Sequence, residues 1–428
     1  MSVAAHNLTH DVTYEDLYRR WEEGNWKTSE LDFTEDRKGW AALSDIQKRS
    51  GLWIYSMFFY GEDSVTDNLS PYIDAAPKEE QKYFLATQQV DEARHAIFFH
   101  RFFKEVLDAG DSIASTLAYT EPQLGWGYRK VFERLDSMAD ELRKDRSLPK
   151  FAQAITLYHL IVEGALAQPG QHFIEDFFMK SGAMPGFSEG MTFVSRDEQR
   201  HIGFGVKVLS ELVAESDECK AAIDELLSEV MRYSVAVFVP PGWNREYTEC
   251  YGFSLEDIYA FGLKMIKQRW RTIGYPIEEM PPGVFPLDIE SPEDEVARRS
   301  IRMLEAGVIG EFTGNPDSSP DVQQYYFESM ARSADPNSVN GDAVTYQWRF
   351  SDAEPWHLVI ENGSTRAVAG LAPNPNLTLE TSWTDWISGT SGTEDMRKLM
   401  LKRRVKPRGS LRELARLAKV FPRSASSS

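Results

Sequence analysis

Cysteine is nearly absent from this 428-residue chain, which contains only Cys219 and Cys250. Two cysteines are too few for a disulfide framework or a thiolate metal site, so any bound metal would be held by oxygen and nitrogen. Long apolar runs are also lacking, since none approaches the roughly 18 residues that a membrane-spanning helix needs. The first 17 residues have no basic stub followed by an apolar stretch, so a secretory signal is not expected. These absences favour a reduced, cytoplasmic setting.

Basic residues are outnumbered, with 47 Lys and Arg against 66 Asp and Glu and a formal net charge of -19. Most of this surface would repel a phosphate backbone, so we expect no nucleic-acid partner. Residues 397–423 are the exception, because they contain eleven basic residues and a single acid, Glu413. This basic segment could make peripheral contact with anionic lipid headgroups, or it could be a solvated face that balances the acidic remainder.

The first two thirds of the chain are predicted to be helical. Four long segments are mostly apolar with few helix breakers, and three shorter amphipathic segments accompany them. Helices that are apolar nearly all round belong inside a larger helical body. We therefore expect a four-helix bundle from residues 47–68, 78–107, 149–180 and 187–214, with extra helices at 127–145, 219–236 and 255–271.

The pattern changes after residues 276–292, which are rich in proline and acids and cannot continue a helix. Short alternating segments follow, and two helical segments flank them, which is typical of a small α+β module. The predicted strands are 344–350, 356–361, 366–371 and 377–383, and the predicted helices are 321–333 and 410–420.

One motif, Asp-Glu-x-Arg-His, occurs twice, at residues 91–95 and 197–201. Residues three apart share a helix face, so the Glu and the His of each copy can bind metal from a single helix. The other two bundle helices each offer one glutamate in apolar sequence. Four carboxylates and two imidazoles are the ligand set of di-iron and di-manganese bundles. The predicted metal ligands are Glu62, Glu92, His95, Glu163, Glu198 and His201.

A single Glu-x-x-His is a weak signal, because it is more often a surface pair than a metal ligand. The alternative for the whole set is six solvated side chains, or salt bridges to Arg94 and Arg200. Their apolar surroundings argue against this alternative, since unpaired buried acids are costly. Ligating histidines usually donate their other N–H to a carboxylate. We therefore predict that Asp91 orients His201 and that Asp197 orients His95. None of the other histidines has a partner spacing, and we expect His100, His159 and His172 to be packed or capped residues.

With these motifs, residues 52–214 resemble the ribonucleotide reductase small-subunit superfamily, and more closely its manganese/iron ligand-binding oxidases. The resemblance also rests on residues 61–65 and 88–95 and on the 35-residue step from Glu163 to Glu198. It implies a ferritin-like fold, a homodimer and a cofactor of Mn and Fe or of two Fe, with dioxygen as the oxidant. It also implies a long-chain fatty acid or other lipid-like ligand in an apolar tunnel, which Phe58, Phe59, Phe98, Phe99 and Phe173 could line.

In that oxidase family, a valine three residues after the first ligand glutamate becomes joined by an ether bond to a tyrosine five residues before the third. The resemblance therefore implies catalytic roles for Val65 and Tyr158. Val65 shares a helix face with Glu62. Five residues turn an ideal α-helix by about 500°, so Tyr158 would leave the Glu163 face unless a π-bulge re-aims it. The alternative is that both are ordinary core residues.

Residues 321–421 resemble a sterol-carrier-protein-like lipid-binding domain, through residues 357–363, 377–379, 383–387 and 396–406. The division that follows is a ferritin-like oxidase domain at 1–285, a linker at 286–320, a sterol-carrier-like domain at 321–422 and a disordered tail at 423–428.

We therefore predict an oxidoreductase that activates dioxygen at a dinuclear metal centre and oxidises an aliphatic, lipid-like ligand by two electrons. One alternative is a hydroxylase, desaturase or N-oxygenase of a small molecule, which would need an electron donor. Another is a ribonucleotide reductase small subunit, although Phe99 stands where such subunits usually carry a radical tyrosine. A third is a protein that binds metal and lipid without catalysis.

Overall fold

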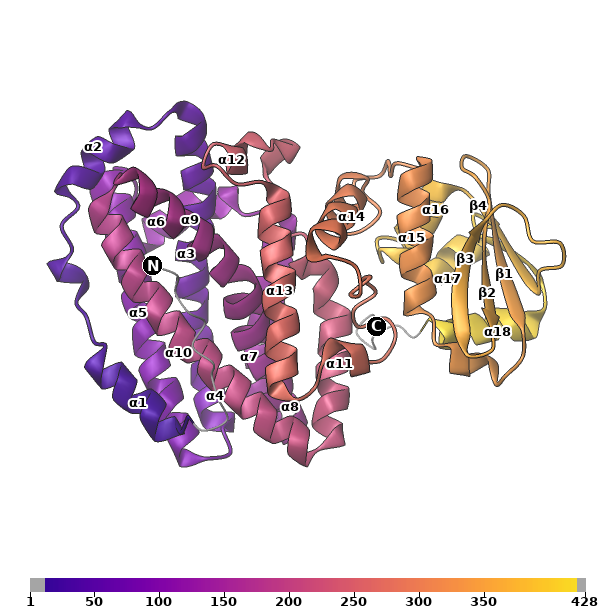
Figure 1. The fold of residues 1–428 in the computed structure, drawn as a ribbon, viewed down its shortest axis with the longest axis horizontal. Helices are drawn as coiled ribbons and strands as arrows, with labels where there is room; N and C mark the ends of the chain where they lie inside the picture. The colour runs from indigo at the N-terminus through magenta and orange to yellow at the C-terminus, as the bar shows by residue number, and fades with distance from the viewer. Residues whose placement is uncertain (1–11, 422–428) are drawn as a thin grey trace. The chain divides into compact units, whose positions relative to one another are not determined.

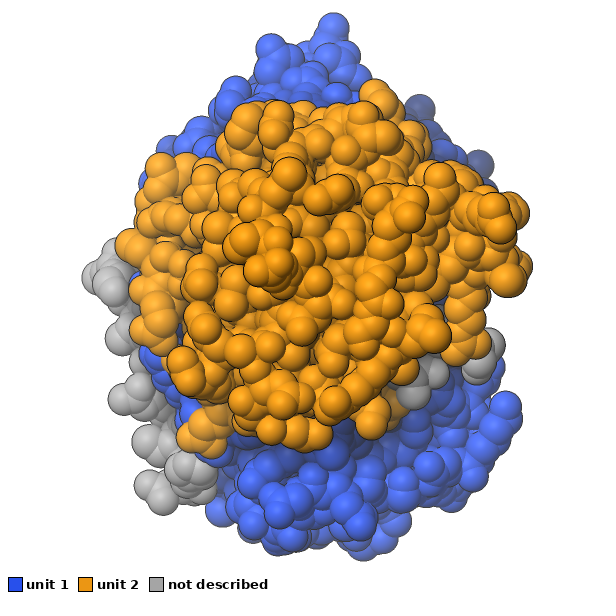
Figure 2. Space-filling model, turned by 90° about the vertical axis from the view of Figure 1, so that its right-hand side faces the viewer, with its two compact units in different colours: residues 1–223, 237–276 blue, residues 224–236, 277–428 orange. Residues whose placement is uncertain are grey.

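The computed structural model describes residues 12–421, and the tail predicted at 423–428 lies outside them. The chain divides into two compact units, which Figure 2 shows in different colours. Unit 1 comprises Met1–Ile223 and Val237–Pro276, and unit 2 comprises Asp224–Ala236 and Ile277–Ser428. Within residues 12–421, no helix is both long and apolar enough to cross a lipid bilayer.

Four long helical stretches form the centre of unit 1 (Figure 1). Three are single helices, and the fourth is composite, with a π-helix between two α-helices. This arrangement confirms the predicted ferritin-like four-helix bundle. The single helices are α3 (Asp45–Asn68), α5 (Glu79–Val106) and α10 (Pro185–Glu215), and the composite one joins α8 (Leu148–Ile155), η3 (Thr156–Ala167) and α9 (Gln168–Ser181).

The start of α10 is fixed by a buried carboxylate from another helix. Asp36 accepts hydrogen bonds from the backbone N–H groups of Gly186, at 2.9 Å, and Phe187, at 2.7 Å. A carboxylate in this place pairs N–H groups that the helix leaves free and complements the positive end of its dipole. Residue 186 has to be glycine, because a Cβ would lie 2.3 Å from the carbonyl oxygen of Asp32. The contact sets where along the bundle the second motif copy lies.

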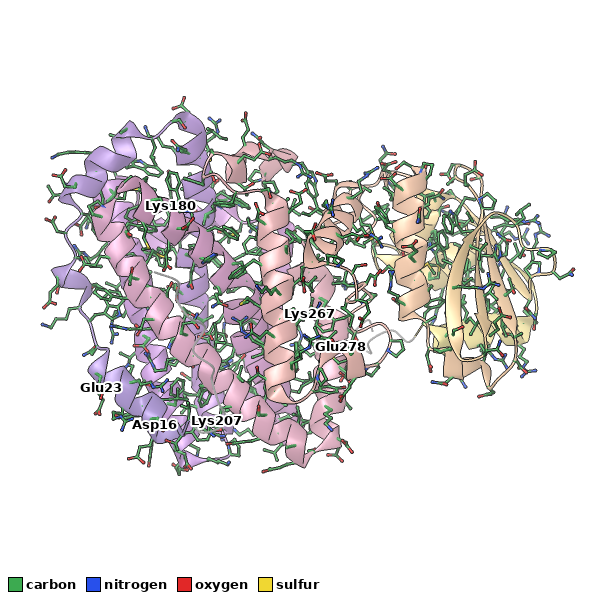
Figure 3. All side chains as sticks on the ribbon, in the orientation of Figure 1. Asp16, Glu23, Lys180, Lys207, Lys267 and Glu278 are labelled. Atoms are coloured by element: carbon green, nitrogen blue, oxygen red, sulfur yellow. The ribbon has the colours of Figure 1, made fainter. Side chains whose placement is uncertain are left out.

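Shorter helices accompany the bundle in unit 1. Charged side chains such as Glu23 and Lys180 extend from its outer surface (Figure 3). The shorter α-helices are α1 (Tyr14–Glu23), α2 (Thr34–Ala42), α4 (Ser70–Ala75), α6 (Ile113–Thr120), α7 (Trp126–Lys144), α12 (Glu246–Glu249) and α13 (Leu255–Ile273), and α11 (Asp217–Ser234) runs from unit 1 into unit 2.

Unit 2 is built on a five-stranded sheet with the order β3-β2-β1-β4-β5. The pair β1 and β4 is parallel, and the other neighbouring pairs are antiparallel. A core of buried apolar side chains includes Phe327, Trp348 and Trp383. The strands are β1 (Val344–Phe350), β2 (Trp356–Glu361), β3 (Ser364–Ala369), β4 (Leu377–Thr381) and β5 (Lys406–Gly409), and the helices are α14 (Glu293–Glu305), α15 (Pro320–Ser333), α16 (Trp383–Thr390), α17 (Met396–Leu401) and α18 (Leu411–Val420).

Several elements of unit 2 differ from the sequence-based expectation. Helices α16 and α17 were not predicted, and β3 lies two residues before the predicted strand 366–371. Helix α14 lies inside the segment 286–320, which was expected to be a linker. Its buried Ala297, Ile301 and Leu304 follow helical spacing, and three acids in its first turn complement the helix dipole. Strand β5 has the polar sequence Lys-Pro-Arg-Gly, which carries no alternating apolar pattern. Proline is tolerated there because β5 is an edge strand.

Candidate metal centre

The six predicted ligand residues lie together in the interior of unit 1. Glu62 comes from α3, Glu163 from η3, and the two motif copies come from α5 and α10. All six side chains are buried. The six residues form two overlapping groups of four, and within each group one ligand atom from every residue lies within 4.8 Å of those of the other three. The first group is Glu62, Glu92, His95 and Glu198, and the second is Glu92, Glu163, Glu198 and His201. Glu92 and Glu198 belong to both groups, which is the arrangement that bridging carboxylates require.

Each imidazole presents its Nδ1 atom to the carboxylates. His95 Nδ1 lies 3.3 Å from Glu62 Oε2 and 3.4 Å from Glu92 Oε2. His201 Nδ1 lies 3.1 Å from Glu92 Oε1 and 3.3 Å from Glu163 Oε1. The two rings therefore face one carboxylate cluster from opposite motif copies.

Burial makes this concentration of acids costly. It raises the pKa of Glu62 to about 8 and that of Glu163 to about 7, and it raises the pKa of Glu198 well above its usual range. Burial acts in the same direction on Glu92, but His201 and His95 hold the pKa of that carboxyl well below its usual value. A protein that keeps four acids in such a place needs cations beside them.

The donor atoms of the cluster fit a pair of metal ions. Glu163 Oε2 and Glu198 Oε2 are buried and have no hydrogen-bond partner among the described residues. Carboxylates and imidazoles suit iron and manganese, and two carboxylates shared by both groups allow bridging. The arrangement can therefore hold two metal ions.

A crosswise arrangement orients the two imidazoles. Asp197 Oδ2 lies 3.3 Å from His95 Nε2, and Asp91 Oδ2 lies 3.2 Å from His201 Nε2. Each histidine thus contacts the aspartate of the other motif copy, on the other helix. Because Nε2 faces a carboxylate in each ring, Nδ1 is left for the cluster.

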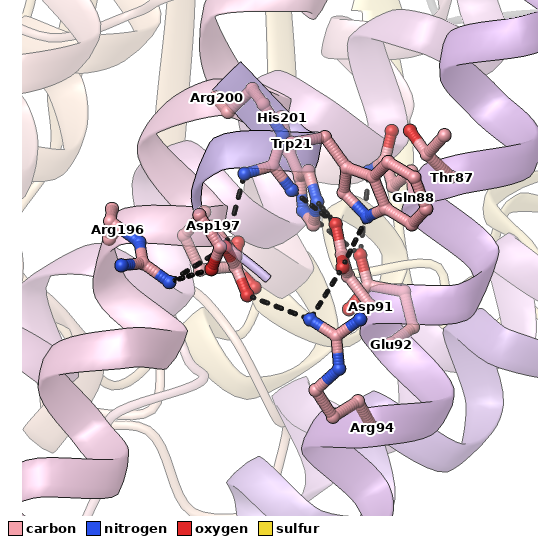
Figure 4. A network of polar contacts seen from close by, with 12 residues as sticks. Trp21, Thr87, Gln88, Asp91, Glu92, Arg94, Arg196, Asp197, Arg200 and His201 are labelled. Atoms are coloured by element: carbon pink, nitrogen blue, oxygen red, sulfur yellow. Dashed lines mark hydrogen bonds and ion pairs between the residues drawn. The ribbon is translucent and has the colours of Figure 1, made fainter. Parts of the chain in front are cut away.

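Arginine and tryptophan side chains complete this outer network, and Figure 4 labels Trp21, Arg94, Arg196 and Arg200 around the two aspartates. Arg94 lies between the aspartates, with Nη1 at 3.1 Å from Asp91 and 3.7 Å from Asp197. Arg200 also pairs with both aspartates. Trp21 donates its indole N–H to Asp91 at 2.9 Å, and Trp26 donates to Asp197 at 2.8 Å. Neither tryptophan could be predicted from the sequence, since no spacing connects residues near the start of the chain to the motif helices.

Gln88 and His159 form a second polar chain that reaches the cluster. Burial lowers the pKa of His159 to about 3, so the ring is neutral at physiological pH. Its Nε2 lies 3.0 Å from Gln88 Oε1. The Gln88 amide then donates to Glu163 at 2.8 Å and to Glu92 at 3.4 Å. His159 is packed as expected, but its bond to Gln88 was not foreseen.

The structure also brings Val65 and Tyr158 to the cluster. Both line a cavity together with Glu62, Glu92, Glu163 and Glu198, and its empty space amounts to about 600 Å³ including the opening. The Tyr158 phenol donates to Glu92 Oε1 at 2.6 Å. Of the five phenylalanines suggested as tunnel residues, only Phe58 lines this cavity. The apolar part of the lining includes Ile54, Met57, Phe58, Val162, Leu166 and Phe238.

A π-helix explains how Tyr158 reaches the site. Tyr158 and Glu163 both lie in η3, and at its end the N–H of Gln168 donates to the carbonyl of Glu163, five residues earlier. In a π-helix the i→i+5 bonds place residues five apart above one another, whereas an α-helix places them on different faces. The five-residue spacing of Tyr158 and Glu163 therefore matches this local backbone.

Comparisons with known proteins agree with this geometry. The model of the family described as ribonucleotide reductase, small chain, matches residues 6–238. A variant of an R2-like ligand-binding oxidase with an anaerobically reconstituted Mn/Fe cofactor is 25% identical, with a TM-score of 0.52 over 61% of this chain and 94% of its own. Another variant, in which a tyrosine is replaced by phenylalanine, is 25% identical, with a TM-score of 0.53 over 61% of this chain and 93% of its own.

An R2-like ligand-binding oxidase from Sulfolobus acidocaldarius is 24% identical. Its TM-score is 0.53, over 66% of this chain and 94% of its own. At this identity the match bears on the fold alone. The family match ends at residue 238, before the sheet of unit 2.

Proposed function

This chain belongs to the ribonucleotide reductase small-chain family, and from that premise we propose that it is a dioxygen-activating dinuclear metal oxidase acting on an aliphatic, lipid-like ligand. Its similarity to R2-like ligand-binding oxidases makes it an oxidoreductase. The observation that carries the proposal is that two buried groups of candidate metal ligands, each made of carboxylates and one histidine, share Glu92 and Glu198.

We assign one metal to Glu62, Glu92 and His95 and the other to Glu163, Glu198 and His201. The cofactor is a Mn/Fe pair, as reconstituted in the similar oxidases, or a pair of iron ions. Bound there, the metals supply the redox chemistry by which dioxygen is reduced to water. Since general affinity trends favour Fe(II) over Mn(II), selection of manganese would depend on site geometry and metal supply.

The surrounding residues have separate tasks in this proposal. Asp91 and Asp197 fix the orientation of the imidazoles, and the Arg94 and Arg200 guanidinium groups pair with these aspartates and hold them in place. The apolar lining excludes water from the place where the ligand is oxidised. The phenol of Tyr158 is held against Glu92, which is the nearest acceptor for its proton.

We further propose that Val65 and Tyr158 become joined by an ether bond. The reaction removes one hydrogen from the Val65 side chain and one from the Tyr158 hydroxyl, and a C–O bond replaces the C–H and O–H bonds. It releases two electrons and two protons. Reduction of dioxygen to two waters takes four electrons and four protons, so the other two electrons come from the reduced metals and two protons from solvent. Catalytic oxidation of a free ligand would instead take its additional electrons from an external donor.

The cavity supports a lipid-like ligand. Its walls are largely aliphatic and aromatic, while four acids lie at its polar end. A long-chain fatty acid would place its chain against the apolar wall and its carboxylate toward the bound metals. We also propose that residues 321–422 form a lipid-binding domain similar to sterol carrier proteins, joined to the oxidase domain through residues 286–320.

Mass spectrometry tests the central proposal. Metal-free protein is reconstituted anaerobically with Mn(II) and Fe(II), exposed to air, and analysed for metal content, intact mass and linked peptides. We expect about two metals per chain and the loss of two hydrogens, with peptides containing Val65 and Tyr158 joined. Tyr158→Phe should keep the metals and lose the link.

The other results separate the alternatives. Two metals without the link, together with release of an oxidised product on addition of reductant, would favour a hydroxylase, desaturase or N-oxygenase. Metal binding without oxygen consumption would favour a protein that stores metal and carries lipid. Absence of bound metal would contradict the proposal as a whole.

We propose that the protein is a homodimer in which α5 packs against α5 of a second copy. Tyr83, Val90 and Ile97 are 60%, 52% and 43% exposed, and their seven-residue spacing gives one apolar seam along the helix. An antiparallel pair would place the acidic start of α5 beside Lys104 at the end of the partner helix. Val90→Glu with Ile97→Glu should yield monomers in sedimentation experiments. Met179→Glu, at an exposed apolar position on α9, should not.

For the basic segment we propose peripheral contact with anionic lipid. Leu401 and Leu411 are 84% and 81% exposed, and both lie among basic residues. An exposed leucine beside lysine and arginine suits the interface of an anionic membrane. Co-sedimentation with vesicles containing phosphatidylserine should fall for Leu401→Ser and should be lost in high salt. Equal binding to neutral vesicles would contradict this proposal.

A further inference from the structure

The register of the π-helix η3 gives the carbonyl of Gly164 no backbone donor. The N–H of Gln168 donates to the carbonyl of Glu163. In the same register the next carbonyl, that of Gly164, would accept from residue 169. That residue is Pro169, which has no N–H. Because an unpaired buried carbonyl is costly, Gly164 needs a donor from elsewhere in the fold.

Arg269 of α13 is that donor. Its Nη1 group donates to the carbonyl of Gly164, and its Nη2 group donates to the side-chain oxygen of Gln168. The absence of a side chain at residue 164 makes the approach possible, since a Cβ there would lie 2.7 Å from Arg269 Nη1. One guanidinium therefore holds the junction between η3 and α9 at two points.

This junction determines which residues of η3 reach the metal cluster. Tyr158 and Glu163 both contribute to the same cavity only because the backbone follows i→i+5 bonding between them. If the segment returned to α-helical bonding, the two side chains would point to different faces of the helix. The guanidinium keeps its charge at neutral pH, because burial lowers the pKa of Arg269 only to about 10 and the charge of Glu163 opposes that shift.

We propose that Arg269 is a positioning residue of the metal centre, which pairs the carbonyl that Pro169 leaves free and so holds the π-helical register of Tyr158 and Glu163. Its effect on metal binding rests on the proposed metal centre. Its effect on the register of η3 does not, so the two can be measured separately.

Hydrogen exchange of the metal-free protein tests the register. In Arg269→Gln, amides of residues 156–168 should exchange at least 10-fold faster, while those of α3 and α5 should be unchanged. Lys264→Gln, at an exposed position on the same helix, is the matched control and should leave exchange unchanged. In Arg269→Lys, which keeps one donor for the Gly164 carbonyl, exchange should be intermediate. This variant also serves if Arg269→Gln fails to fold.

A second substitution separates positioning from general packing. Pro169→Ala restores a backbone N–H that can donate to the Gly164 carbonyl in the π-helical register. The double variant Pro169→Ala with Arg269→Gln should therefore regain most of the protection lost in Arg269→Gln. A merely structural contribution of the guanidinium would not be rescued in this way.

Metal titration against a competing chelator gives the second readout. Arg269→Gln should weaken one of two metal equivalents about 10-fold, as loss of an outer contact typically does, and the double variant should restore it. Unchanged exchange in Arg269→Gln, or absence of rescue, would overturn the proposal. Faster exchange with both metals bound as tightly as in the parent protein would also overturn it. If the parent protein binds no metal, the proposed function fails, while the exchange data still decide the role of Arg269 in the register.

Discussion

The phenol of Tyr158 donates a 2.6 Å hydrogen bond to the Oε1 atom of Glu92, which lies 66 positions earlier in the chain. The bond joins the π-helix η3 to α5 at the centre of the bundle. Burial raises the pKa of Tyr158 well above its usual range, and the negative charge of Glu92 adds to the shift. Tyr158 therefore keeps its proton throughout the neutral range, and any chemistry at its oxygen has to begin with transfer of that proton.

Replacing a carboxylate common to both ligand groups should remove metal without harming the fold. In Glu198→Gln we expect metal content to fall from about two ions per chain to one or fewer, measured by elemental analysis after dialysis. The metal-free variant should melt at the same or a higher temperature, because a buried acid has been replaced by a neutral side chain. Glu175→Gln, which lies outside the ligand groups, should keep both metals. A lower melting temperature together with metal loss would indicate misfolding instead.

The crosswise aspartates should act on opposite halves of the centre. Asp91→Asn should weaken the metal held by His201, and Asp197→Asn the metal held by His95, each by about 10–100-fold. Competition with a chelator, followed by the distinct spectra of Mn and Fe, distinguishes the two. Asp63→Asn, beside the ligand Glu62 in sequence, serves as the control and should change neither affinity. Equal loss of both metals in each variant would contradict the crosswise assignment.

Glu175 should make unfolding depend on pH. Burial raises the pKa of this α9 carboxyl to about 7, although a hydrogen bond from Ser195 opposes the shift. The folded protein thus holds this proton more tightly than the unfolded chain does. The contribution of Glu175 to stability is fully present below pH about 4.5 and is lost as the pH rises through about 7. The melting temperature of the parent protein should therefore fall relative to Glu175→Gln between those values. A difference that does not vary with pH would contradict the raised pKa.

Gln347 should be important for the sheet of unit 2. Its side-chain amide donates to the carbonyls of Trp348 and Trp356, each at 2.8 Å, and its oxygen accepts from the N–H of Ala372 at 2.7 Å. In Gln347→Leu these buried groups lose their partner, which should cost about 2–4 kcal/mol. Hydrogen exchange of β1 and β2 measures the loss, and metal content should stay constant. Gln324→Leu, at an exposed position on α15, should change stability by about 0.5 kcal/mol or less.

Much of unit 1 could be predicted because its pattern is local. The duplicated motif places Glu92 with His95 and Glu198 with His201 on their own helices, whatever the rest of the fold does. The helices α3, α5 and α10 begin and end within two residues of the expected bounds. In unit 2 the strands β1 and β2 have the expected bounds, because their apolar residues alternate.

Other features depend on contacts between distant segments. On an α-helix the five-residue spacing of Tyr158 and Glu163 would place the two side chains on different faces, whereas the observed π-helix places them on one face. Trp21 and Trp26 carry no motif, so their bonds to the aspartates could not be inferred from spacing. The chain from His159 through Gln88 likewise joins residues more than 70 positions apart. In such places tertiary packing decides the role of a residue, and composition does not.

The crosswise pairing of aspartate and histidine also has a consequence for how the protein is made. Glu62, Glu92 and His95 leave the ribosome roughly a hundred residues before Asp197, which contacts His95. Until α10 has been synthesised and has packed beside α5, the imidazole of His95 lacks the acceptor that orients it. In the proposed metal centre, tight metal capture would therefore be postponed to the last stage of bundle assembly, and a truncated nascent chain would be kept from holding a redox-active ion.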